Sequence, residues 1–173
     1  MASNFITYTK HGVAESTLLK ATQVGHHYNL VNESKDIDNG SVAVIGERKK
    51  ADVFEAKVPA KGDKIVLILT APKIYEEYTT KMQEESNFYN GKGEVMRAYE
   101  IQDTDRFTLS TEAFNSDAEL AVGKYVFVDG TGFKLTTGEK PNMAQYGFVG
   151  HIYEIANNGN YRIWVDKNAQ VYA

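Results

Sequence analysis

Short runs of alternating apolar and polar residues, separated by turns rich in glycine and asparagine, constrain this chain more than any other feature. The pattern is clearest from Gly123 to Asp166. There, strand-like segments flank the turn sequences Asp129-Gly-Thr-Gly and Asn157-Asn-Gly-Asn. Side chains of a strand point alternately to its two faces, and Asn-Gly or Asp-Gly pairs favour tight turns. The sequence therefore predicts consecutive antiparallel strands, with hairpins at 129–132 and 157–160.

Similar segments recur along the rest of the chain at short intervals. The most apolar is Lys64-Ile-Val-Leu-Ile-Leu-Thr, whose length and β-branched residues are typical of a central, fully buried strand. Only residues 74–87 are polar and loosely helical. We predict a mainly β fold, with one or more compact antiparallel barrel-like or sandwich-like domains and at most one or two short helices.

The N-terminal residues 1–30 show no sustained strand or helix period. They contain short apolar pieces, such as Phe5-Ile-Thr-Tyr, with more large apolar residues than a solvated tail usually has. We predict an extended N-terminal arm over 1–30 and a β domain over 31–173. A weak resemblance between the two halves of that domain leaves open whether it is one unit or two lobes, 31–93 and 94–173.

Composition narrows the classes of partner. The net charge of −4 and pI near 5.6 give no basic surface of the kind that binds nucleic acid, and no apolar run is long enough to span a membrane. The absence of cysteine excludes disulfides and thiolate sites. The N-terminus has no signal-peptide pattern, so we expect synthesis in the cytoplasm without secretion.

Catalytic motifs are absent from the sequence: there is no nucleophile elbow, phosphate-binding loop or dinucleotide-binding turn. Glu76 and Glu77, beside tyrosines, fit either a glycosidase cleft or a solvated loop. His26 and His27 could bind a metal, but adjacent strand residues point to opposite faces. We therefore predict no enzyme activity, no cofactor and no metal site.

Aromatic and apolar side chains are the candidates for partner contact. In the predicted arm these are Phe5, Ile6 and Tyr8, which could add apolar area when the arm pairs with a neighbouring sheet. Trp164 alternates with Ile163 and Val165, so it points away from both. The sequence leaves open whether Trp164 lies in the core or on a contact face.

Five segments of the chain resemble small head-associated proteins, of the decoration or cement type, of tailed bacteriophages. The resemblance covers most of residues 36–165, and from Val122 to Asp166 the pattern also resembles the β cores of lambda-type decoration proteins. The segments are Asp38-Asn-Gly, Ala71-Pro-Lys-Ile-Tyr, Phe88-Tyr-Asn-Gly-Lys-Gly-Glu, Arg97-Ala-Tyr-Glu and Val122-Gly-Lys-Tyr-Val.

The resemblance implies a non-enzymatic virion protein, assembled in the host cytoplasm, that binds the capsid and stabilises it by bridging subunits. Its partners would be the major capsid protein, further copies of itself on the particle, or both. Two rivals stay open: a glycan- or receptor-binding β module of a head fibre or tail, with exposed aromatics near 75–90, and a head or tail connector component.

Overall fold

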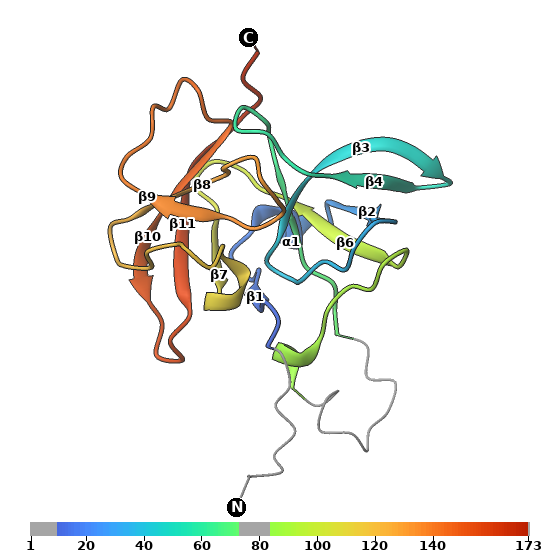
Figure 1. Cartoon of the computed structure of the whole chain (residues 1–173), viewed down its shortest axis with the longest axis horizontal. Helices are drawn as coiled ribbons and strands as arrows, with labels where there is room; N and C mark the ends of the chain where they lie inside the picture. The colour runs from blue at the N-terminus through green and yellow to red at the C-terminus, as the bar shows by residue number, and fades with distance from the viewer. Residues whose placement is uncertain (1–9, 73–83, 173) are drawn as a thin grey trace, which may run out of the picture.

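Strands dominate the protein, which confirms the predicted fold class. The computed structural model describes residues 10–72 and 84–172 (Figure 1). The structure is 39% strand and 7% helix. Its helical elements within the described residues are α1 (Lys20–Val24) and two single 3₁₀ turns, η1 (Glu85–Asn87) and η2 (Thr111–Ala113).

The first half of the chain forms a closed five-stranded barrel, on the right in Figure 1. The strand order is β2-β4-β3-β5-β6, and β6 pairs back to β2. All neighbours are antiparallel except β2 and β4, which run parallel. The barrel strands are β2 (His27–Val31), β3 (Val42–Lys50), β4 (Val53–Lys57), β5 (Val66–Ile68) and β6 (Val95–Glu100).

The second half contributes most of a six-stranded antiparallel sheet in the order β1-β7-β11-β10-β8-β9. Its long central hairpin, β10 to β11, turns at 157–160 as predicted, with Gly159 at a positive φ of 82°. The sheet strands are β1 (Ala14–Glu15), β7 (Arg106–Leu109), β8 (Tyr125–Phe127), β9 (Thr136–Gly138), β10 (Phe148–Ile155) and β11 (Tyr161–Asn168).

The predicted hairpin around 129–132 also forms, but its second strand begins later than the alternation suggested. β8 pairs with β9, which begins at Thr136. The intervening Phe133 packs into the barrel interior, whereas Leu135 packs into the core beneath the sheet. The alternation at 133–135 therefore reflects insertion into two different cores rather than pairing with β8; Leu135 forms only an isolated bridge with Phe114.

β5 is a strand of the barrel, but its side chains pack into both the barrel core and the core beneath the sheet. Val66 and Ile68 point into the barrel, while Ile65, just before the strand, and Leu67 pack against residues of the sheet. All four are at most 4% exposed. Burial on both faces explains why this segment is the most apolar run of the sequence, and it confirms the prediction of a central buried strand.

The expected arm over 1–30 is replaced, in the described residues, by elements of the fold. β1 pairs with β7, and β2 is a barrel strand. Leu19 and Leu30 are fully buried. The segment showed no sustained period because three short elements each bury only one or two side chains.

The boundary between two possible lobes, placed at 93/94 from the sequence, does not separate the barrel from the sheet. β6 completes the barrel after that boundary, so the barrel strands span 27–100.

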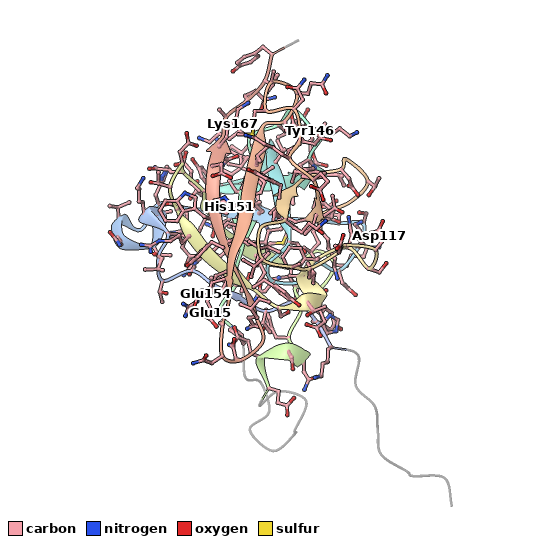
Figure 2. All side chains as sticks on the ribbon, turned by 90° about the vertical axis from the view of Figure 1, so that its left-hand side faces the viewer. Glu15, Asp117, Tyr146, His151, Glu154 and Lys167 are labelled. Carbon is pink, nitrogen blue, oxygen red and sulfur yellow. The ribbon has the colours of Figure 1, made fainter. Side chains whose placement is uncertain are left out.

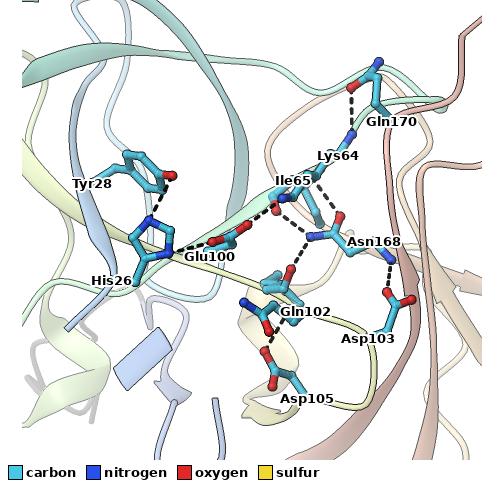
Figure 3. Close-up of polar contacts among 11 residues, drawn as sticks. His26, Tyr28, Lys64, Ile65, Glu100, Gln102, Asp103, Asp105, Asn168 and Gln170 are labelled. Carbon is cyan, nitrogen blue, oxygen red and sulfur yellow. Dashed lines mark hydrogen bonds and ion pairs between the residues drawn. The ribbon is translucent and has the colours of Figure 1, made fainter. Parts of the chain in front are cut away.

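The side chain of Asn168, at the end of β11, joins the sheet to the barrel (Figure 3). Its Oδ1 accepts a hydrogen bond from the Ile65 backbone N–H at 3.0 Å, and its Nδ2 donates to the carbonyls of Ile65 and Ile101 at 2.9 and 2.7 Å. Its own N–H donates to Asp103 at 2.8 Å. One carboxamide thus satisfies three backbone groups where the two units meet.

The backbone at the start of β10 also lies close to the barrel segment before β5, where the two units meet. The Gly147 N–H donates to the Lys61 carbonyl at 2.8 Å, and a Cβ at position 147 would overlap the carbonyl oxygen of Asp63. Only glycine allows the start of β10 to lie this close to the barrel connection.

Replacing Asn168 by alanine should destabilise the protein strongly. Buried polar groups left without partners cost roughly 1–3 kcal/mol each, so we expect the free energy of unfolding to fall by about 3 kcal/mol. Urea unfolding measures this change. Asn157→Ala in the exposed β10–β11 turn is the control and should shift stability by no more than about 0.5 kcal/mol. An equal effect of both substitutions would contradict the assigned role of Asn168.

The Glu100 carboxylate forms a second link, between the barrel and the segments before β2 and β5. It lies 2.7 Å from His26 Nδ1 and 2.5 Å from Lys64 Nζ (Figure 3). The hydrogen bond from Lys64 lowers the pKa of Glu100 below its ordinary value, against the opposing effect of burial.

This lowered pKa makes stability depend on pH in a defined direction. A carboxyl whose pKa is lower in the folded state stabilises the fold above its unfolded pKa of about 4.3, and this contribution is lost as pH falls through the folded value. We expect Glu100→Gln to flatten the loss of stability between neutral pH and about pH 3. Urea unfolding across that range tests this, with the exposed Glu33→Gln as control. An unchanged profile in Glu100→Gln would contradict the prediction.

Candidate functional site

The outer face of the six-stranded sheet carries the most distinctive side chains of the described surface. Along β11, Ile163 and Val165 are buried beneath the sheet, while Arg162, Trp164 and Asp166 alternate with them and are partly exposed. Figure 2 looks onto this side, with His151 of β10 near its centre. The alternation of β11 from Arg162 to Asp166 therefore places these aromatic and charged residues on one accessible face.

Trp164 is held in place by two neighbours on this face. The Arg106 guanidinium of β7 lies 5.5 Å from the centre of its ring, and the Tyr153 ring of β10 meets it edge to face at 6.3 Å. Trp164 is therefore half-buried on the outer face, which answers the question left open by the sequence. We call Arg106, Tyr153, Arg162 and Trp164 the Arg–Trp strip.

The two arginines of the strip differ in their charge partners. Arg162 Nη1 lies 2.9 Å from a Glu154 carboxylate oxygen, and this pairing raises the pKa of Arg162. Arg106 forms no ion pair with any residue that the structure describes. A shallow hollow of about 250 Å³, lined in part by Glu15 and Leu18, lies beside both arginines. Arg106 thus presents an available cation stacked on an aromatic ring.

Next to the strip on the same face lie a paired histidine and carboxylate, since His151 of β10 is the cross-strand neighbour of Trp164. His151 Nδ1 lies 2.8 Å from Asp166 Oδ2, and the two side chains are 33% and 26% exposed. An ionised carboxylate only accepts hydrogen bonds, so Nδ1 carries the proton. The ring of Tyr125, on β8, is centred 6.2 Å from His151. We call the open cavity that they border, together with Gly123, Lys140 and Met143, the His–Asp hollow; its volume is about 410 Å³.

Lys167 fixes the segment that borders this hollow. Its ammonium donates 2.8 Å hydrogen bonds to the carbonyls of Met143 and Tyr146. Lys167 and Tyr146 are labelled near the top of Figure 2. Tyr146 in turn packs edge to face on Phe127 of β8 at 5.1 Å. The segment between β9 and β10 is therefore attached to the sheet at defined points.

The other candidates from the sequence lie elsewhere. Phe5, Ile6 and Tyr8 are outside the described residues, as are Glu76 and Glu77. Residues 73–83, most of the aromatic stretch suggested for glycan contact, are also outside them; Tyr89, at its end, packs on His11 with ring centres 4.7 Å apart.

The two adjacent histidines have separate partners. His26 pairs with Glu100, and His27 Nδ1 lies 3.0 Å from the Gly25 carbonyl oxygen. No cluster of three potential metal ligands occurs within residues 10–72 and 84–172. In the same ranges, no helix has the length and apolarity needed to cross a membrane.

Sequence reasoning identified Trp164 but missed the residues around it. The sequence pattern indicated in part which residues share the outer face, because positions 162, 164 and 166 alternate with buried residues, as do 151 and 153 around Ile152. Which strands are neighbours could not be inferred: Arg106 meets Trp164 because β7 pairs with β11, across a long sequence separation.

Comparisons with protein-family models, with curated proteins and with solved structures find no match for this chain.

Removing the Lys167 ammonium should loosen the segment at 139–146. Hydrogen bonds to charged groups contribute roughly 1.5–3 kcal/mol, so Lys167→Met should lower stability by about 2 kcal/mol and speed amide exchange at 142–147. Hydrogen exchange measured by mass spectrometry tests this, with the exposed Lys92→Met as control. Unchanged exchange in Lys167→Met would show that other contacts hold the segment.

Proposed function

We propose that this protein is a non-catalytic structural component of a tailed-phage particle, and that it binds the protein shell of the head through the Arg–Trp strip. The observation that carries the proposal is the packing of Trp164 between Arg106 and Tyr153 on an accessible sheet face. The shell is named as partner because of the sequence resemblance over residues 36–165.

The composition of the strip favours a protein partner. Tryptophan, tyrosine and arginine are enriched at the centres of protein interfaces, where they contribute much of the binding energy. The neighbours of Trp164 already fix its ring, so little side-chain entropy would be lost on binding. The strip therefore has the chemistry of an interface centre.

The charge of Arg106 indicates what the partner surface should offer. A guanidinium binds a carboxylate through two parallel hydrogen bonds, and it does so best at a partly desolvated site. Arg106 has no such partner among the described residues, whereas Arg162 is paired with Glu154. We expect an acidic side chain of the shell protein to lie opposite Arg106.

The underlying strands favour contact through side chains rather than through backbone pairing. β7, β10 and β11 each have a strand on both sides over at least part of their length, so much of their backbone is engaged within the sheet. A rigid face with fixed side chains suits repeated binding of many copies to a regular lattice, where individually weak contacts act together.

Substitution of Arg106 provides the direct test. Purified protein is mixed with phage heads that lack it, and binding is followed by sedimentation. Arg106→Glu should weaken saturable binding by more than about tenfold, because charge reversal at an interface centre opposes an acidic partner. Lys50→Glu, an equal charge change at the exposed end of β3, should bind as the wild type does. Deleting residues 1–30 is a poor test, since it removes β1, α1 and most of β2.

Two outcomes would contradict the proposal: no binding of the wild type to heads, or equal binding by Arg106→Glu and Lys50→Glu. Heat resistance of the heads with and without the protein checks the stabilising role separately. Binding to isolated tails in place of heads would favour the connector alternative.

A further inference from the structure

We propose that the His–Asp hollow is a binding site for a saccharide. This inference concerns a second function and does not rest on shell binding. The hollow adjoins the Arg–Trp strip, because His151 is the cross-strand neighbour of Trp164, but none of its lining residues belongs to the strip. In Figure 2, His151 lies between Lys167 and Tyr146 at the top and Glu15 and Glu154, which line the shallow cavity beside Arg106, below.

The hollow has the size of a small-ligand site. Its volume of about 410 Å³ lies within the range of roughly 300–1,000 Å³ that is common for such sites. It is open to solvent on one side, and Gly123 on its border turns with a positive φ of 89°, with no atom within 4 Å of where a Cβ would be. A ligand of one or two sugar rings can therefore enter without displacing a side chain at that position.

The border of the hollow is organised before any ligand arrives. The His151–Asp166 hydrogen bond fixes the imidazole, and Lys167 holds the segment that includes Met143. The amide of Asn142 also caps this segment, accepting from the Ala144 N–H at 3.1 Å. Preorganisation of this kind removes part of the entropic cost of binding.

The polar groups at the hollow include both hydrogen-bond donors and acceptors. When the His151 imidazole is neutral with its proton on Nδ1, its Nε2 is an acceptor, and Asp166 Oδ1 makes no hydrogen bond within the described residues. The exposed Lys140 ammonium is a donor with no ion-pair partner in the same residues. The Tyr125 hydroxyl can donate or accept. Each hydroxyl of a sugar ring both donates and accepts hydrogen bonds, so a sugar is suited to a site that offers donors and acceptors together.

The apolar part of the lining is also suited to a sugar. The Tyr125 ring and the Met143 side chain provide flat, apolar surface beside the polar groups, and the C–H face of a pyranose can pack on an aromatic ring. Hydroxyls at the edge of the sugar would then reach Asp166, His151 and Lys140.

Other ligand classes fit the hollow less well. A wholly apolar ligand would remove water from Asp166 Oδ1 and the Lys140 ammonium without replacing its hydrogen bonds. A phosphate would face the Asp166 carboxylate with one lysine to oppose the repulsion. An extended peptide cannot add to the sheet here, because β8 and β10 both have strands on either side.

A glycan array of neutral and acidic oligosaccharides, followed by titration of each bound glycan by calorimetry, tests the proposal. The wild type should bind at least one glycan saturably. Asp166→Asn and Lys140→Ala should each weaken that binding at least tenfold, and Tyr125→Ala should abolish it. The controls are Asp117→Asn, an exposed aspartate also labelled in Figure 2, and Tyr172→Ala, a tyrosine that is 88% exposed.

Arg106→Glu separates this proposal from shell binding, since it should retain glycan binding. Thermal unfolding of each variant shows whether a loss reflects the site or the fold, and the exposed Lys140→Ala remains informative if Tyr125→Ala is unstable. The proposal is overturned if the wild type binds no glycan on the array, or if Asp166→Asn and Lys140→Ala bind as strongly as the controls do.

Discussion

The double-sided burial of β5 is the constraint on which the rest of this structure depends. Its alternate residues belong to two cores, one inside the barrel and one beneath the sheet, so neither unit has a complete core without it. The Asn168 carboxamide then holds the end of β11 against the backbone at Ile65, immediately before β5. Because this link is a set of buried hydrogen bonds with defined directions, it fixes the orientation of the sheet on the barrel as well as its proximity.

A sheet attached in this way is a rigid base for the side chains on its outer face. Its inner face packs on the shared core, and its interior strands pair on both sides over at least part of their length, so recognition at the outer face depends mainly on side chains. Two neighbouring parts of that face differ in chemistry. One part presents a tryptophan fixed between an arginine and a tyrosine, which is suited to a protein surface. The other presents a histidine, a carboxylate, a lysine and a tyrosine around a hollow, which is suited to a small polar ligand.

Several features of this arrangement were accessible from the sequence. The alternation of β10 and β11, the turn at 157–160 and the apolar segment around β5 follow from local pattern and turn chemistry, because each element can be identified within its own residues. The elements before residue 31 were not identified. β1, α1 and β2 are too short to show a period, and their burial depends on distant partners such as β7 and β6. The candidate site was predicted only at Trp164.

The sequence by itself determined that the chain is mainly β, where its longest hairpin turns, and that Trp164 points away from Ile163 and Val165. Only the tertiary structure decided that Trp164 faces outward beside Arg106 and Tyr153, and that His151 meets Asp166. The physical reason is that strand alternation fixes which residues share a face, whereas long-range pairing fixes which strands are neighbours and which face is covered. That choice depends on the packing of all the strands together, and no single segment encodes it.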